Sequence, residues 1–198
     1  MQSFSDFKDS LPQKEKNRLL LEGVATNNFN LVYLAMLLGA DANSNNGLAI
    51  DWAASNGKRT LVKALIESGA DVTANDNAAI CHASEHGHWE IVEKLIEAGA
   101  DVNAKNGYPI CIASEFGYST IVGLLIPAGA NVNACDGYPI LMASINGHTD
   151  VVRLLFDAGA DVTIRDYSSA LQIAAADGYK EILDLFIEAG ANPDAINK

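Results

Sequence analysis

The sequence predicts an all-α protein in which one helix-turn-helix unit is repeated along the chain, forming an α-solenoid. A Gly-Ala pair followed by Asp or Asn recurs in six copies, at steps of 30, 30, 30, 30 and 31 residues. These pairs begin at Gly39, Gly69, Gly99, Gly129, Gly159 and Gly190. A second glycine lies twelve residues before each of the last five pairs, at Gly57, Gly87, Gly117, Gly147 and Gly178. A fixed period of this length is typical of a solenoid built from one supersecondary unit.

The unit at residues 99–128 encodes two short helices. The first is predicted over 109–116, because Pro109 suits the first turn of a helix and Gly117 can end it in a left-handed conformation. The second is predicted over 120–128, where apolar residues recur with helical spacing. Both are shorter than the about 12 to 15 residues at which isolated helices become marginal. We therefore expect their stability to come from packing against neighbouring units.

Small residues indicate where adjacent units pack closely. An alanine precedes each mid-unit glycine by four residues, at Ala53, Ala83, Ala113, Ala143 and Ala174. Between units, Asx-Gly pairs such as Asn106-Gly107 and Asp136-Gly137 indicate tight hairpin turns. So few β-prone residues flank these turns that we expect little or no strand.

The motifs of the repeat point to a known family. Residues 108–114 read Tyr-Pro-Ile-Cys-Ile-Ala-Ser, 138–144 read Tyr-Pro-Ile-Leu-Met-Ala-Ser, and Gly-His occurs at 87–88 and 147–148. Together with the Gly-Ala-Asp endings, these resemble the ankyrin repeat, whose first helix carries T-P-L-H-x-A. The resemblance covers residues 15–193.

Two features depart from the usual ankyrin repeat. The period is 30 residues rather than about 33, which implies a trimmed hairpin loop. The Thr and His of T-P-L-H are also replaced. This short-period form is similar to ankyrin proteins of giant DNA viruses and intracellular bacteria.

We expect one ankyrin-repeat domain over residues 12–193, with a frayed N-terminus over 1–11 and a tail over 194–198. The expected units are 12–40, 41–70, 71–100, 101–130, 131–160 and 161–191. The first of these is degenerate and is expected to cap the stack, because one face of a terminal unit must meet water.

Composition places the chain among globular proteins of a reducing compartment. It is 198 residues long and 49% apolar, with no apolar run near the about 18 residues of a membrane span and no leader-like start. We expect a cytoplasmic protein, or one of the host cytoplasm if its source is viral or bacterial. Its three cysteines are an odd number. Cys81 and Cys111 occupy equivalent positions in adjacent units, and stacked helices about 8 to 10 Å apart hold them beyond disulfide reach.

The net charge of −12 arises from residues 31–198, since residues 1–30 hold equal numbers of acids and bases. Such a surface repels nucleic acid. Two interpretations remain open for a protein partner. The acidic exterior serves solubility alone, or it attracts a basic partner.

One catalytic motif is present. His82-Ala83-Ser84-Glu85-His86 spells H-x-x-E-H, a zinc-hydrolase signature on a helix. The repeat phase places His82 in an interior column and Glu85 and His86 in an exposed one, and no third ligand is evident. No phosphate-binding glycine motif occurs either. We therefore expect no enzyme, metal or cofactor, and keep a metal-dependent hydrolase as a rival hypothesis.

The resemblance implies a protein-protein interaction module that binds its partner on a concave face made by the first helices. The residues expected there are Glu85, His86, Tyr108, Glu115, Phe116, Tyr138, Ile145 and Asn146. Phe116 and Ile145 either form an apolar patch or tuck against a neighbouring helix. Tyr108 and Tyr138 either contact the partner or shield the shortened turn.

Two further expectations concern packing and assembly. Trp89 and Tyr118 follow mid-unit glycines, where packing between helices is expected. We expect a monomer, with a self-associating structural module as a further alternative.

Overall fold

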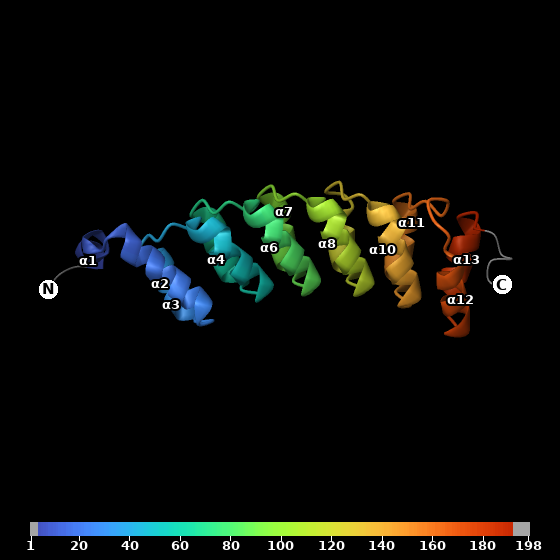
Figure 1. The fold of residues 1–198 in the computed structure, drawn as a ribbon, viewed down its shortest axis with the longest axis horizontal. Helices are drawn as coiled ribbons and strands as arrows, with labels where there is room; N and C mark the ends of the chain where they lie inside the picture. The colour runs from blue at the N-terminus through green and yellow to red at the C-terminus, as the bar shows by residue number, and fades with distance from the viewer. Residues whose placement is uncertain (1–3, 192–198) are drawn as a thin grey trace. The chain divides into compact units, whose positions relative to one another are not determined.

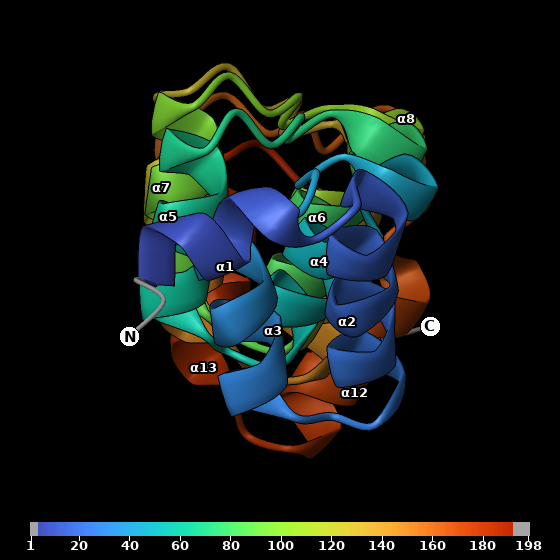
Figure 2. The same ribbon diagram turned by 90° about the vertical axis from the view of Figure 1, so that its left-hand side faces the viewer.

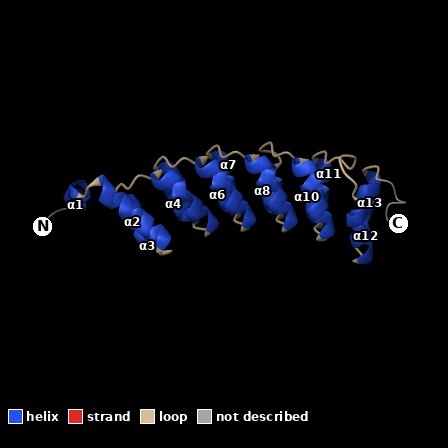
Figure 3. Cartoon of the chain, in the orientation of Figure 1, coloured by secondary structure: helices blue, strands red, loops and turns tan. Residues whose placement is uncertain are grey.

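The computed structural model describes residues 4–191 (Figure 1). These residues form thirteen helices and no strand (Figure 3), which confirms the all-α prediction. None of these helices has both the length and the apolar character that a membrane span requires. The chain divides into two compact units, Met1–Asp101 (unit 1) and Val102–Lys198 (unit 2).

Unit 1 is a stack of three helix pairs. Its helices are α1 (Phe4–Ser10), α2 (Gln13–Ala25), α3 (Phe29–Leu37), α4 (Ser44–Ser55), α5 (Arg59–Glu67), α6 (Ala74–Glu85) and α7 (Trp89–Glu97). Each pair packs on itself, and α4 lies between α2 and α6. Helix α1 runs crosswise to α2 and α3 (Figure 2). The expectation of a frayed segment over 1–11 is therefore wrong for Phe4–Ser10.

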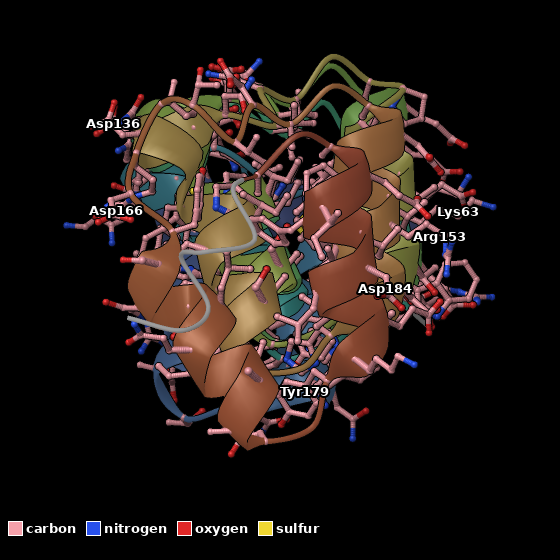
Figure 4. All side chains as sticks on the ribbon, turned by 90° about the vertical axis from the view of Figure 1, so that its right-hand side faces the viewer. Lys63, Asp136, Arg153, Asp166, Tyr179 and Asp184 are labelled. Carbon is pink, nitrogen blue, oxygen red and sulfur yellow. The ribbon has the colours of Figure 1, made fainter. Side chains whose placement is uncertain are left out.

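Unit 2 repeats the same arrangement. Its helices are α8 (Ala104–Glu115), α9 (Ser119–Leu125), α10 (Ala134–Ile145), α11 (Thr149–Asp157), α12 (Ser168–Ala176) and α13 (Lys180–Glu188). Helices α8, α10 and α12 form one row of contacts, and α9, α11 and α13 form the other. Within this unit, Figure 4 shows Asp136 and Asp166 on the side of the loops and first helices, and Arg153 and Asp184 on the side of the second helices. The tail predicted over 194–198 lies outside the described residues.

Glycine and proline determine where the helices end. Gly117 has φ +73° and Gly129 has φ +94°, both in the left-handed region that closes a helix without a Cβ penalty. Helix α9 ends at Leu125, three residues before its expected end. The reason is Pro127, which has no N–H for the next helical hydrogen bond.

The loops between pairs contain a left-handed turn in place of a hairpin finger. Three consecutive residues have positive φ in each of four loops, at 45–47, 75–77, 105–107 and 135–137. The right-handed part of each first helix starts directly afterwards. A Cβ on Gly107 would lie 2.5 Å from Ala134 Cβ, so the loops of consecutive pairs approach too closely for a side chain there.

The small residues do pack where the sequence indicates. The five alanines of the first helices are all 0% exposed. A matching column of apolar residues fills the second helices, and it is also 0% exposed: Leu65, Leu95, Leu125, Leu155 and Phe186. Burying such a column contributes about 1.5 to 3 kcal/mol per side chain, which holds together helices too short to be stable alone.

One asparagine in each of three loops holds the start of the next loop, an arrangement that we call the loop clamp. Asn103 Nδ2 donates to the carbonyl oxygen of Gly129 at 2.9 Å. Its Oδ1 accepts from the amide of Asn131 at 2.8 Å. Asn43 makes the equivalent pair of bonds two periods before, and Asn133 makes it one period after. The clamp satisfies backbone groups that a β-hairpin would otherwise pair.

Candidate functional site

Six of the eight residues predicted to bind a partner lie in unit 2, on α8 and α10 or directly after them. They are Tyr108, Glu115, Phe116, Tyr138, Ile145 and Asn146. Contacts between α8 and α10 bring them into one patch. Glu85 and His86 lie at the end of α6 in unit 1. We call the six residues of unit 2 the α8–α10 patch.

A tyrosine and a glutamate form the polar centre of this patch. Tyr138 Oη donates to Glu115 Oε2 at 2.9 Å, which joins α10 to α8. Burial, and then the hydrogen bond to the Glu115 carboxylate, raises the pKa of Tyr138. Both effects favour the neutral phenol. At neutral pH this residue is therefore a hydrogen-bond donor that fixes the orientation of the carboxylate.

The carbonyl group of Glu115 anchors the end of the next first helix. Asn146 Nδ2 donates to this oxygen at 2.9 Å, and His148 Nε2 lies 3.0 Å from it. A carbonyl oxygen only accepts, so the His148 tautomer that fits this contact carries its proton on Nε2. Asn146 is thus both an exposed residue of the patch and a structural link.

Phe116 carries most of the exposed apolar surface of the patch. Its side chain is 49% exposed, whereas Ile145 is half-buried. The Phe116 ring lies 5.8 Å from that of Tyr118 in a tilted arrangement. The ring thus has one aromatic neighbour and stays about half exposed. Of the two alternatives stated for Phe116 and Ile145, exposure describes the first residue and partial burial the second.

A pocket of about 190 Å³ opens beside the two tyrosines. Tyr108 and Tyr138, both half-buried, line it together with Cys111, Ile112 and Cys135. The tyrosines therefore line a pocket that also contains the turn residues Lys105 and Cys135.

The histidines of H-x-x-E-H make separate contacts in unit 1. His82 Nδ1 lies 2.5 Å from Asp51 Oδ1, and the His82 side chain is 37% exposed. Its column is half-buried rather than interior, since Trp52, Ile112 and Met142 at the same position of other first helices are also half-buried. His86 Nδ1 lies 2.8 Å from the carbonyl oxygen of His82, and its ring stacks on His88 at 6.1 Å.

Two further residues complete the comparison with the sequence. Trp89 is 46% exposed, so the expectation that it packs between helices is wrong. Its position at the first residue of α7 points the indole outward. Tyr118, which directly precedes α9, is half-buried. Among residues 4–191, no three His, Cys, Asp or Glu side chains gather as a metal site would require.

Comparison with known proteins agrees with the repeat pattern. A family model described as ankyrin repeats in three copies matches residues 20–106 and again 110–197. The search of curated proteins gave no match for the chain. The two matched segments span most of its length and leave out, among the described helices, only α1, the start of α2 and residues 107–109 of α8. The chain therefore belongs to the ankyrin-repeat family.

Proposed function

We propose that this chain is a non-catalytic module that binds another protein through the α8–α10 patch. Ankyrin repeats are generic protein-protein interaction modules. The observation that carries the proposal is the exposure of Phe116. The equivalent position in the other pairs is held by the polar residues Asn56, His86, Asn146 and Asp177, so an exposed aromatic ring here departs from the pattern of the repeat.

The surroundings of Phe116 suit an anchor for a partner. Aromatic side chains dominate binding energy when the residues around them exclude water. Here the hydrogen bonds of Glu115 to Tyr138 and Asn146 hold the rim of the patch in place before binding. Little side-chain entropy is then lost in the complex, which favours affinity.

The charge of the chain supports a basic partner. The net charge is −12, and Glu115 places a carboxylate next to Phe116. A partner segment with an apolar side chain flanked by Lys or Arg would complement both features, and the long-range field would speed its association. Glu85 and His86 are proposed as further contacts on unit 1. We further propose that the chain acts as a monomer in the cytoplasm.

The test compares Phe116→Ser with Trp89→Ser in capture of partners from lysate, after circular dichroism has shown that both variants are folded. Trp89 is similarly exposed but lies at the start of a second helix, so it controls for the loss of an exposed aromatic ring. We expect wild type and Trp89→Ser to retain a partner that Phe116→Ser loses, with affinity at least about 30-fold weaker, as for a hot-spot aromatic residue.

Equal capture by all three proteins would place the binding surface elsewhere. Light scattering over a range of concentrations tests the alternative of self-association. We expect the mass to stay at that of one chain. A mass that rises with concentration and falls back in Phe116→Ser would instead assign the patch to contacts between copies.

A further inference from the structure

Two cysteines from consecutive helix pairs meet at the pocket of unit 2. Cys111 lies on α8 and is 5% exposed. Cys135 is the first left-handed residue of the following loop, with φ 49°, and it is exposed. Both line the same pocket of about 190 Å³. One thiol is therefore open to solvent, and the other lies beside it in the protein.

The contacts of the two sulfur atoms hold them together. Asn106 Nδ2 lies 3.3 Å from Cys135 Sγ, and the Cys135 thiol faces the carbonyl oxygen of Asn106 at 3.5 Å. Cys135 also contributes to the raised pKa of Cys111, in agreement with both thiols lining one pocket. Asn106 thus holds the exposed sulfur of Cys135 at the start of α8.

We propose that Cys111 and Cys135 form a redox-active dithiol, which a low-molecular-weight disulfide converts into a disulfide bond between two consecutive ankyrin repeats. The inference rests on these two side chains and does not depend on the partner-binding function proposed above. It also differs from the cysteine pair that the sequence draws attention to, Cys81 and Cys111.

The reaction is a pair of thiol-disulfide exchanges. The Cys135 thiolate attacks one sulfur of oxidised glutathione, which forms a mixed disulfide and releases one glutathione thiolate. The Cys111 thiolate then attacks the Cys135 sulfur and releases the second. Two protein thiols are oxidised to one disulfide, while one glutathione disulfide is reduced to two glutathione molecules, which take up the two protons.

Exposure assigns the order of the two steps. Cys135 is accessible to the oxidant, whereas burial, followed by the neighbouring Cys135 and Glu115, raises the pKa of Cys111 to about 12. The buried thiol is a poor first nucleophile, since the thiolate is the reactive form. The second step is therefore slower at neutral pH and accelerates as pH rises. The other charged or titratable groups lining this pocket are Lys105, Tyr108 and Tyr138.

The experiment uses the full chain, treated with oxidised glutathione and analysed by mass spectrometry without reduction. Trypsin leaves both cysteines in one peptide, residues 106–153, and Cys81 in another, residues 64–94. We expect the first peptide to lose the mass of two hydrogen atoms. Cleavage after Glu115 separates the two cysteines, so fragments that remain joined identify the bond.

Thiol counting gives a second readout. In denaturant, the oxidised wild type should show one free thiol instead of three, and Cys81→Ser should show none instead of two. Cys135→Ser changes an exposed residue and removes the attacking thiol, so it should retain both of its buried thiols, Cys81 and Cys111. A glutathione adduct on wild-type Cys135 that never resolves, or covalent dimers in place of the internal bond, would overturn the proposal.

Discussion

Unit 1 closes its loops in three different ways, whereas unit 2 uses a single way twice. In unit 2, Asn103 and Asn133 each make both bonds of the loop clamp. In unit 1, Asn43 does the same for the loop that follows it. At the preceding loop, the two bonds of the clamp come from two residues of α2. Gln13 Nε2 donates to the carbonyl oxygen of Gly39, and Asn17 Oδ1 accepts from the amide of Asp41.

The third form in unit 1 moves the clamp four residues along the chain. Thr73 stands where Asn43 stands one period earlier, and its hydroxyl donates to Asp71 within its own loop at 2.7 Å. The amide of Asp101 is instead accepted by Asn77 Oδ1 at 2.9 Å. Asn77 occupies the position of a glycine in the other loops, with φ 58°. Asn is among the few residues that adopt this conformation readily.

The comparison shows that each repeat needs a hydrogen-bond acceptor for one backbone amide, and that no particular residue has to supply it. In all five clamps the amide of the Asp or Asn after Gly-Ala receives a side-chain oxygen from the preceding pair. Leaving a backbone donor without a partner costs more than any particular donor–acceptor pair contributes. Different side chains can therefore meet the same need.

The largest expected effect comes from removing the glycine that the unit 2 form requires. We expect Gly107→Ala to lower the free energy of unfolding by about 2 to 4 kcal/mol, from left-handed strain and from overpacking. Its Cβ would meet Ala134 Cβ at 2.5 Å. Gly129→Ala is the matched control, because it has φ +94° but open space around its Cβ. Urea unfolding measures both, and equal losses would contradict the role assigned to close approach.

The clamp itself should have the next largest effect. We expect Asn103→Ala to cost about 1 to 3 kcal/mol, since two net hydrogen bonds of about 0.5 to 1.5 kcal/mol each are lost. Thr73→Ala serves as the control, because the Thr73 side chain bonds only within its own loop. A loss for Thr73→Ala as large as that for Asn103→Ala would show that the bonds between loops have no special weight.

A double variant tests whether the two forms are interchangeable. We expect Asn77→Gly to cost about 0.5 to 1.5 kcal/mol, the value of the bond to the amide of Asp101. Adding Thr73→Asn rebuilds the unit 2 form and should recover most of that loss. The double-mutant cycle then gives a coupling energy of opposite sign to the single change. If Thr73→Asn changes the free energy of unfolding by the same amount with and without Asn77→Gly, the two positions do not substitute for each other.

The smallest effect concerns the loops that carry threonine. Hydrogen bonds from the hydroxyl group and then the amide of Thr73 lower the pKa of Asp71 below its ordinary value of 3.8. Thr163 lowers the pKa of Asp161 in the same way. A depressed carboxyl pKa adds stability above the unfolded-state value, and this stability is lost as pH falls through the folded value. We expect Thr73→Ala, but not Thr73→Ser, to raise the Asp71 pKa in a carboxyl-carbon NMR titration. Identical titration curves in all three proteins would contradict this cause.

The sequence was sufficient for the helix pairs because their signals are local. Glycines at a fixed period end the helices, and alanines four residues before them mark the tightest packing. Helix α1 was missed, since residues 1–11 lie outside the repeat and carry no periodic signal. The hairpin expectation identified the Asx-Gly residues with positive φ but not the left-handed residue before them, because Lys105 and Cys135 are not residue types that adopt this conformation readily.

The candidate site was harder to predict because its geometry joins different repeats. Phe116 could be singled out from the sequence because it is an aromatic residue at a predicted surface position, and it is exposed. The contact between Cys111 and Cys135 was missed, since equivalent positions in neighbouring units draw attention to Cys81 instead. The bond between Tyr138 and Glu115 spans 23 residues and depends on the offset between a first helix and the following loop. Such offsets can be predicted only after the stacking of one repeat on the next is known.

The loop clamp also bears on how a chain like this changes its length. Because the partners of Asn43, Asn103 and Asn133 are main-chain atoms that every period supplies, the joint needs no matched pair of side chains. A tandem duplication or deletion of one 30-residue repeat would create a new junction between repeats. The backbone atoms at that junction could already accept and donate the bonds of the clamp. The surface residues are then free to diverge without the scaffold having to be rebuilt, so new binding surfaces can arise by copying and drift.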